Sequence, residues 1–541
     1  MKYKYFLSSL LLIGLLTSCK KSFLERTPED TFVDANFYKT TDQILAAGAP
    51  LYNRVWFDYN DKASHGIGDA RGGVLFSGSY QIENIQMRTS SVTAEVGASW
   101  SSFYNIVAQA NSLITNVPKY AGAAVPEDVK NYALAEGHFM RGLAYSYLVQ
   151  NWGPVPIITD NVAALVDTSI SRNTIESIWK FIIRDMQFAV NNTPAKAPLP
   201  GRLNKWAAEG MLAKMYLTRA GVGGNGSRNQ SDLDSAKYFA KDVIDNSGST
   251  LMQNYEDLFL MKNNNNPESI FALQWKYDGD YGSQNSVQAY LAYGSEITGF
   301  ADGWGGDIGA SKYIMDKYDA SDKRRHATFM YPGDHYSYIH QATKTGTKEL
   351  DVPVNSKDAD GVQYGSRGWD KKYVVGRPED NDGKVQQQRT EINSYMLRLA
   401  DVYLIYAEAV LGNNTTTVDP LALQYFNAVH TRAGLSALTS ISFDDIFNER
   451  LLEFAMEGQA WYDLVRLHYY NPAKAFDILS KQDRGSYRIY PNAITGATSW
   501  KVVSDAPAYY SVTEANFYIP YPSGEQTQAP NLSKPPVPYP F

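Results

Sequence analysis

Residues 136–156 read EGHFMRGLAYSYLVQNWGPVP, and this stretch decides the fold. Its apolar side chains recur at the i, i+1, i+4, i+5 spacing that places them on one face of an α-helix. Trp152-Gly153-Pro154 then ends the pattern, because proline does not continue a helix. We therefore predict an amphipathic helix over 136–150 whose buried stripe consists of Phe139, Met140, Leu143, Ala144, Tyr147 and Leu148.

The same helical period recurs on both sides of this stretch. Paired helices of this length predict stacked hairpins of the tetratricopeptide kind, with the ~34-residue period blurred by insertions. An irregular helical bundle would bury the same faces and is the alternative. The predicted fold class is mostly α, with helical segments over roughly 34–250 and 390–470. The further periodic stretches are 175–190, 203–220, 233–244, 398–411, 421–432, 443–456 and 460–469.

Residues 251–389, between the two helical segments, differ in composition. They are rich in Gly, Asn, Asp, Tyr and Trp and contain only short apolar runs such as 270–275. We interpret them as a large loop-rich insertion with a little β structure, which is where a rigid scaffold usually carries its binding function. The proline-rich tail, 518–541, is predicted to be extended.

The N-terminal residues predict export and anchoring. Lys2 and Lys4 precede an apolar run that ends in Leu-Thr-Ser-Cys at 16–19. This run is too short to span a bilayer and is typical of a signal peptide, here 1–18. Cleavage would leave Cys19, the only cysteine, at the new N-terminus, where its thiol is expected to carry a lipid anchor. The alternative is a chance cysteine after an ordinary signal. The mature chain, 19–541, is expected to form one domain.

Charge and composition bound the partners. The chain has 541 residues and a formal net charge of -7, so its surface does not attract polyanions and no nucleic-acid partner is expected. Its 39 Tyr, 22 Phe and 10 Trp suit surfaces that stack on sugar faces, but they suit ordinary cores equally well. Composition alone does not choose between these two uses.

No sequence motif points to enzyme chemistry. The chain contains no GxSxG, P-loop or dinucleotide fingerprint, and its seven histidines form no HExxH. Asp358-Ala-Asp360-Gly361 resembles half of a calcium loop, but Arg367 stands where the loop glutamate is expected. We therefore predict no catalytic residue, no metal site and no cofactor; irregular calcium binding by loop carbonyls is the alternative that stays open.

Glu449, Glu453 and Glu457 are spaced to lie on one face of a helix, where like charges repel. We interpret them as part of a buried ion network that fixes the junction of a helix pair, with Arg450 and Arg466 as the nearest cations in sequence. The alternative is the acid/base pair of a glycoside hydrolase, which needs two carboxyl groups about 5–10 Å apart across a cleft.

Several blocks in the same order resemble the SusD/RagB family of nutrient-uptake lipoproteins along essentially the whole chain. The strongest is 136–156, and Phe23-Leu24-Glu25 after the lipobox resembles the family's mature start. The acidic-Ile-Asn-Pro pattern that usually closes the family is degraded here at 523–526. The other matching blocks are 100–111, 398–409, 449–466, Ile519-Pro520 and Asn531-Leu532.

The resemblance implies a mostly helical outer-membrane lipoprotein with four tetratricopeptide-like units. It also implies docking on a SusC-like TonB-dependent transporter and capture of an oligosaccharide on an aromatic surface, without catalysis. Cys19 is followed by Lys20-Lys21-Ser22 and not by the acidic pair often associated with surface export. The cell surface is the expected location, with the inner leaflet of the outer membrane as the alternative.

For sugar capture, aromatic rings must face solvent beside side chains that bind hydroxyl groups. Asp69 and Arg71 lie in a stretch, 68–73, that we interpret as a loop resembling the family's acidic loop, and Asn105 is the third polar candidate. For each ring, packing in the core is the alternative. A lid that passes on peptides without a sugar site is a second hypothesis, and a lipid-anchored glycoside hydrolase is a third. The candidate rings are Trp100, Tyr293, Trp304 and Trp369.

Overall fold

The structure is a computed structural model that describes residues 37–167, 169–491 and 500–541. The predicted signal peptide, 1–18, and the expected anchor at Cys19 lie outside these residues. Of the residues described, none belongs to a helix both long and apolar enough to cross a membrane.

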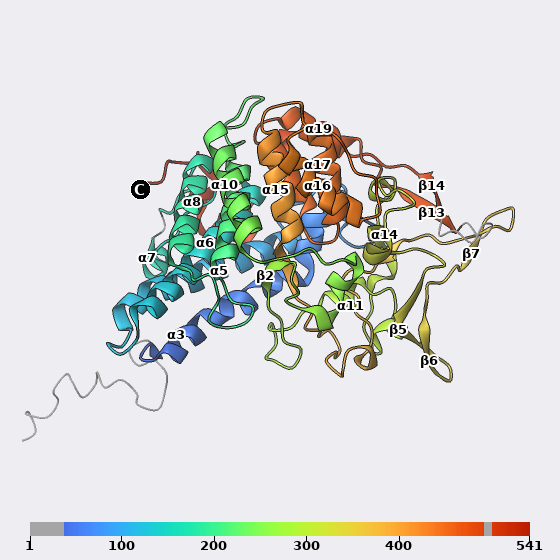
Figure 1. Cartoon of the computed structure of the whole chain (residues 1–541), viewed down its shortest axis with the longest axis horizontal. Helices are drawn as coiled ribbons and strands as arrows, with labels where there is room; N and C mark the ends of the chain where they lie inside the picture. The colour runs from blue at the N-terminus through green and yellow to red at the C-terminus, as the bar shows by residue number, and fades with distance from the viewer. Residues whose placement is uncertain (1–36, 168, 492–499) are drawn as a thin grey trace, which may run out of the picture.

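Long helices form one side of the molecule and continue over its top (Figure 1). Neighbours in sequence pack side by side: α5 on α6, α6 on α8, α9 on α10 and α15 on α16. The mostly α fold with stacked helix pairs is therefore confirmed. The long helices are α5 (Ala94–Tyr120), α6 (Glu127–Trp152), α8 (Ile175–Asn192), α9 (Lys205–Arg219), α10 (Gln230–Asn246), α15 (Leu399–Leu411), α16 (Pro420–Arg432), α17 (Phe443–Glu453), α18 (Ala460–His468) and α19 (Pro472–Ser480).

Further helices and turns fill the connections. The π-helix η4 (Tyr59–Ala70) packs on α5 and α18. The others are α3 (Thr41–Gly48), α4 (Ile82–Ile85), α7 (Asn161–Val166), α11 (Val287–Leu291), α12 (Ser295–Thr298), α13 (Lys312–Met315), α14 (Arg324–Thr328), α20 (Glu514–Phe517), α21 (Ser523–Gln528), and the 3-10 turns η2 (Ala49–Tyr52), η3 (Arg54–Trp56), η5 (Tyr255–Phe259), η6 (Met261–Asn263), η7 (Gly305–Asp307), η8 (Pro378–Asp380) and η9 (Pro530–Ser533).

Helix α6 includes the predicted helix 136–150 and extends it toward the N-terminus. It begins after Pro126, with two acidic residues in its first turn, and ends at Gly153, whose φ of 69° favours glycine. Gly137 lets α5 approach closely, because a Cβ at this position would stand 2.8 Å from a side-chain carbon of Ile114. The predicted apolar stripe is buried: Phe139, Met140, Leu143, Ala144, Tyr147 and Leu148.

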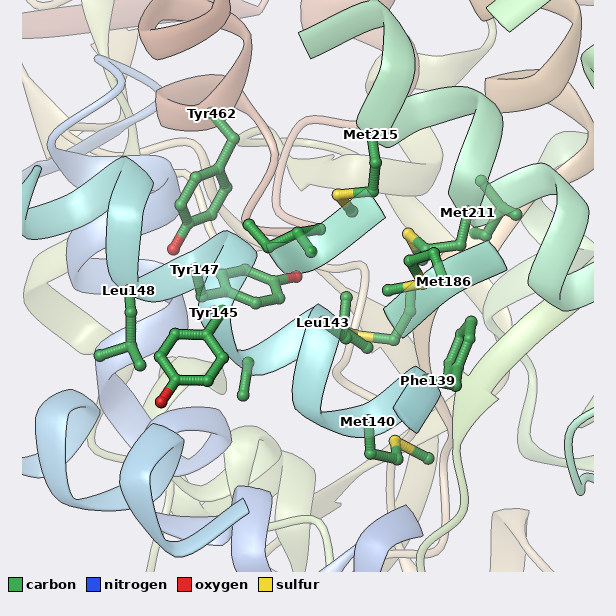
Figure 2. Close-up of a cluster of buried hydrophobic side chains, with 14 of the residues drawn as sticks. Phe139, Met140, Leu143, Tyr145, Tyr147, Leu148, Met186, Met211, Met215 and Tyr462 are labelled. Carbon is green, nitrogen blue, oxygen red and sulfur yellow. The ribbon is translucent and has the colours of Figure 1, made fainter. Parts of the chain in front are cut away.

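Side chains from α6, α8, α9 and α18 meet in one apolar cluster (Figure 2). Leu143 lies at its centre, with Met186 from α8 and Met211 from α9 as neighbours in the view. Tyr462 from α18 packs edge-on against Tyr147, with ring centroids 4.9 Å apart. We call this cluster the helical core. It fixes the helices relative to one another by burial of apolar surface.

Between α10 and α15 the chain forms the loop-rich insertion, which projects from the side opposite α5–α10 (Figure 1). Its strands pair only two by two in the residues described, and β2 pairs with β10 at the base of the insertion. The strands of the chain are β1 (Leu75–Ser77), β2 (Ser269–Leu273), β3 (Ile308–Ala310), β4 (Phe329–Met330), β5 (His335–Thr343), β6 (Gly346–Asp351), β7 (Ser356–Lys357), β8 (Gln363–Tyr364), β9 (Trp369–Asp370), β10 (Ser394–Arg398), β11 (Thr416–Thr417), β12 (Ile441–Ser442), β13 (Ser486–Pro491) and β14 (Trp500–Ala506).

A buried set of ion pairs joins the insertion to α17. Glu453 is fully buried and its carboxylate contacts Arg324 at 3.2 Å and Arg398 at 3.0 Å. Lys372 of the insertion binds Glu457 at 3.0 Å. The surrounding arginines lower the pKa of Glu453, although burial alone would raise it. We call this set the ion-pair junction; its members are Glu268, Arg324, Lys372, Arg398, Arg432, Glu449, Glu453 and Glu457.

The predicted network of the three glutamates is therefore present, but with other partners. Arg450 binds Asp401 at 2.7 Å and Arg466 binds Glu408 at 2.7 Å, so neither is a partner of the glutamates. The cations come from distant parts of the chain, which sequence proximity does not reveal.

The sequence predicts that the tail is extended. In the structure it is extended only in part. Residues Ser523–Gln528 form α21, directly after Pro522, and a 3-10 turn follows over Pro530–Ser533. No proline lies inside α21, and prolines are tolerated just before a helix and in its first turn. The rest of the tail is held by backbone hydrogen bonds, such as that from the N–H of Val537 to the carbonyl of Arg172 (2.9 Å).

Candidate functional site

Trp304 is the most exposed tryptophan among the residues described, with 49% of its surface accessible. Its backbone N–H donates to the carbonyl of Ala289 at 2.8 Å. Only glycine fits on either side of it: a Cβ on Gly303 would stand 2.6 Å from the backbone of Gly294, and one on Gly305 would stand 2.2 Å from another carbonyl oxygen. The loop therefore packs tightly against its neighbours while the indole faces solvent.

Tyr290, on α11, places a second ring beside this indole. The two ring centroids are 5.2 Å apart and their planes make an angle of 54°. The ammonium of Lys62 lies 4.6 Å from the centroid of Tyr290. Burial raises the pKa of Tyr290 to about 12, and the nearby carboxylate of Asp61 adds to the rise. The two rings thus form an angled pair with a cation and an anion beside it.

Tyr80 and Tyr281 extend this pair. Tyr80 precedes Gln81, whose side chain packs against Gly66 of η4, the helix that also carries Asp61. Burial raises the pKa of Tyr80, and the charge of Asp61 adds to the rise. Tyr281 is 68% exposed and meets Phe57 edge-on at 5.2 Å. Its hydroxyl in turn contributes to the raised pKa of Tyr290. We call Tyr80, Tyr281, Tyr290 and Trp304 the aromatic platform.

Asp61 and Lys62, both on η4, supply polar groups at the platform. Burial raises the pKa of Asp61, whereas the hydroxyl of Ser286 and the ammonium of Lys62 lower it. The Ser286 hydroxyl donates a hydrogen bond to Asp61. Pyranose C–H groups pack on ring faces, and sugar hydroxyls bond to carboxylate and ammonium groups. The arrangement is therefore suited to hold a sugar ring.

Of the predicted rings in the insertion, only Trp304 is well exposed. Trp369 is 7% exposed, and its indole N–H donates to the carbonyl of Gly306 at 2.9 Å. Its ring centroid lies 4.5 Å from that of Tyr293, which is half-buried. The expectation that Trp369 offers a bare ring face is wrong, because its ring supports the loop that carries Trp304.

Trp100 and Asn105 lie elsewhere, on α5. Trp100 is 5% exposed and packs against Tyr104 and Trp152, with centroid distances of 4.8 and 5.1 Å. Both predicted residues line a groove of about 510 Å³ between α5, α7 and the tail. No residue of the aromatic platform lines this groove. The structure therefore divides the predicted site between two places.

Asp69 and Arg71 are not available to a ligand. Asp69 is fully buried at the end of η4, where it accepts backbone N–H groups of Met456 (3.1 Å) and Gly458 (3.0 Å). Arg71 is 1% exposed and donates to the carbonyls of Asn516 and Phe517. Their predicted role as polar sugar ligands is wrong, because both side chains instead tie η4 to distant backbone. Of the stretch 68–73 that was expected to be a loop, 68–70 are the end of η4 and 71–73 form a turn.

Sequence reasoning missed three platform residues, Tyr80, Tyr281 and Tyr290. The only signal for the latter two was the abundance of tyrosine in the insertion, which does not say which rings face solvent. Tyr80 follows a serine-rich turn outside the insertion, and no motif marks it.

Within 37–167, 169–491 and 500–541, no group of three or more His, Cys, Asp or Glu side chains is arranged to hold a metal ion.

Comparison with known proteins assigns the family. A sequence profile described as the SusD family matches residues 212–537, and another described as "Starch-binding associating with outer membrane" matches 22–217. The chain belongs to the SusD family. A SusD-like protein of Bacteroides ovatus is 39% identical over 97% of this chain and 96% of its own length.

Solved structures of other SusD-family proteins match the whole fold. One, determined with a xylogluco-oligosaccharide, is 37% identical, with a TM-score of 0.82 over 92% of this chain and 99% of its own. A laminarin-binding SusD-like protein is 22% identical, with a TM-score of 0.66 over 91% of this chain and 98% of its own. The resemblance seen in the sequence is therefore confirmed for family and fold.

Proposed function

We propose that this SusD-family protein binds a neutral oligosaccharide of the xyloglucan type on the aromatic platform and holds it without cleaving it. The observation that carries the proposal is the exposed, angled ring pair of Trp304 and Tyr290 beside Asp61 and Lys62. A relative of 37% identity that was solved with a xylogluco-oligosaccharide supports the choice of ligand class.

The charges around the platform support an uncharged ligand. Lys62 lies 4.0 Å from Asp61, and Arg54 lies 3.6 Å from Asp280, the residue before Tyr281. Because each of these cations has an anion beside it, the platform has little excess charge with which to select an anionic sugar. Ring stacking and hydroxyl bonding then provide the recognition.

Binding without hydrolysis is supported by the position of the glutamates that a hydrolase would have used. Glu449, Glu453 and Glu457 are bound to arginine and lysine side chains inside the ion-pair junction. They do not face each other across an open cleft, as an acid/base pair must.

We further propose that the bound sugar is delivered to a SusC-like TonB-dependent transporter, with the protein anchored through Cys19 at the outer membrane and facing the cell exterior. The family resemblance carries this step, and one matching family description includes association with the outer membrane.

Trp304→Ala tests the site by isothermal titration with a xylogluco-oligosaccharide. Loss of the ring should weaken binding by about 0.5–1.5 kcal/mol beyond the lost contact area, which is roughly two- to twelvefold in Kd, without loss of stability. Tyr238→Ala is the matched control, because it removes a tyrosine that is 66% exposed on α10, and its affinity should equal that of the wild type. Wild-type affinity in Trp304→Ala would refute the platform. Release of shorter sugars by the wild type would refute binding without cleavage.

A further inference from the structure

The carboxylate of Asp307, at the end of η7, joins two segments that carry platform rings. One oxygen, Oδ2, accepts hydrogen bonds from the hydroxyl of Ser77 (2.8 Å), the backbone N–H of Gly78 (2.8 Å) and the hydroxyl of Ser79 (2.7 Å). All three donors belong to the turn that leads into Tyr80. Asp307 itself follows Trp304 by three residues.

Arg367 holds the other side of the same carboxylate. Its Nη2 donates to Oδ1 of Asp307 at 2.6 Å, and its Nε donates to the backbone carbonyl of Asp307 at 3.2 Å. The guanidinium carbon lies 4.7 Å from the ring centroid of Phe76, so the arginine is itself fixed by packing. Although partial burial works to raise it, the hydrogen bonds from Ser79, Arg367 and Ser77 lower the pKa of Asp307 to about 2.

The turn that Asp307 binds has two further internal bonds. The Oγ of Ser77 accepts the backbone N–H groups of Ser79 at 3.2 Å and of Tyr80 at 2.8 Å, while its own hydroxyl donates to Asp307. In the strand pair β1–β3, Ser77 lies opposite Ile308, the residue after Asp307. A series of hydrogen bonds therefore runs from the carboxylate of Asp307, through the hydroxyl of Ser77, to the backbone N–H of Tyr80.

We propose that Asp307 is a positioning residue of the glycan site, which together with Arg367 sets the place of Tyr80 relative to Trp304. The inference rests on the proposed function, because it concerns how the platform is held ready for its ligand. Asp307 is not assigned as a sugar ligand. Its Oδ2 already accepts three donors and its Oδ1 a fourth, which leaves little capacity for a hydroxyl group.

The physical reason is preorganisation. Trp304 and Tyr80 lie on loop segments, and a sugar that stacks on both rings requires both segments in fixed positions. Without the carboxylate, the turn at 77–80 would lose three hydrogen bonds, and binding of the sugar would have to order it. Charge-assisted bonds are the stronger kind and suit this task.

The test compares Asp307→Asn with Asp232→Asn in the otherwise intact chain. The asparagine keeps the size of the aspartate but loses its charge and one acceptor oxygen. Asp232 forms an equivalent two-bond pair with Arg219 between α9 and α10, far from the platform in sequence and on the scaffold. Binding of a xylogluco-oligosaccharide is measured by titration, and hydrogen–deuterium exchange is followed over 77–80 and 304–307.

Asp307→Asn is expected to weaken binding on the order of tenfold and to speed exchange in both segments, while Asp232→Asn changes neither. Ser79→Ala removes one donor and should show the same two effects at a smaller size. This milder variant keeps the inference testable if Asp307→Asn does not fold. Asp307→Glu, which keeps the charge, should recover part of the affinity.

The possible failures are distinguishable. Unchanged exchange at 77–80 and 304–307 in Asp307→Asn would overturn the role of Asp307, whatever the protein binds. Faster exchange with a Kd within twofold of the wild type would overturn its effect on the ligand. A wild type that binds no glycan would overturn the proposed function, and with it the inference.

Discussion

Around α6 and around α17 the same chain is held together by different kinds of contact. In the helical core, Leu143, Met186 and Met211 meet with no charged partner among them (Figure 2). In the ion-pair junction, Glu453 is as deeply buried as Leu143, but arginines from three separate parts of the chain surround it.

The helical core joins long helices, whereas the ion-pair junction joins the insertion to α17, and the kind of contact differs accordingly. Apolar burial is non-directional, and it dominates between long helices, whose faces repeat regularly, although α6 also carries the buried ion pairs Arg141–Asp185 and Glu136–Arg202. The insertion has few long elements, so burial alone does not fix its orientation. Charge-assisted bonds from Arg324 to α17, and from Lys372 to Glu457 in the turn after it, depend on geometry and give the insertion one orientation on this helix. Three predictions test this comparison.

The largest effect is expected when the junction loses its central anion. Glu453→Ala leaves Arg324, Arg398 and Arg432 without one of their buried counter-charges. The free energy of unfolding should therefore fall by about 3–5 kcal/mol. Urea denaturation followed by circular dichroism measures the change. Glu379→Ala is the control, since its pair with Arg377 is exposed and is expected to contribute under about 1 kcal/mol. Equal stability of the two variants would show that the junction does not hold the insertion.

A somewhat smaller loss is expected from the helical core. Leu143→Ala leaves a cavity among Met186 and its neighbours and should cost about 3 kcal/mol in the same denaturation experiment. Leu165→Ala, on α7, is the matched control, because its side chain is 85% exposed and its loss should change stability little. Glycan affinity should stay at the wild-type value in both. A weaker affinity in Leu143→Ala would mean that the core also controls the platform.

The smallest loss of stability is expected around Glu256 when the pH is lowered from 6 to 3. Burial alone would raise the pKa of Glu256, but His326 and Lys371 lower it to about 2. A carboxyl group with a lowered pKa stabilises the fold above its unfolded value of about 4.3 and loses that contribution as the pH falls toward 2. At pH 3 the segment around Glu256 should therefore be less stable by about 1–2 kcal/mol than at pH 6.

Hydrogen exchange, corrected for intrinsic rates, measures this acid effect over 255–260 and over 102–108 of α5, a stretch without Asp or Glu. We expect loss of protection at pH 3 in the first segment and none in the second, where Phe103, Ile106 and Val107 are buried among apolar side chains. Glu256→Gln should remove the pH dependence of the first segment. Equal loss in both segments would contradict a division between a polar insertion and an apolar scaffold.

The sequence predicted the helical half well because a helix repeats its pattern locally. The apolar stripe from Phe139 to Leu148 identifies the buried face of α6 without knowledge of any other element. The ion-pair junction was predicted only in part. The spacing of Glu449, Glu453 and Glu457 shows that cations are needed, but Arg324 and Arg398 reach them through tertiary folding, which leaves no local pattern.

The candidate site was predicted less well for the same reason. The glycines beside Trp304 gave a local signal that its ring is open. Trp369 has no such signal, and its burial depends on the carbonyl of Gly306 and on Tyr293. Asp69 looks like a solvent-facing acid in the sequence, but it accepts N–H groups of residues almost 400 positions away.

Helices α10 and α15 pack against each other although the entire insertion separates them in the chain. The entropy of closing such a loop depends only on the logarithm of its length, and each doubling costs about 0.6 kcal/mol more. Evolution is therefore free to lengthen, shorten or rewrite the segment between these two helices at little thermodynamic penalty to their pairing. The same helical framework is in this way able to carry insertions of different length and surface.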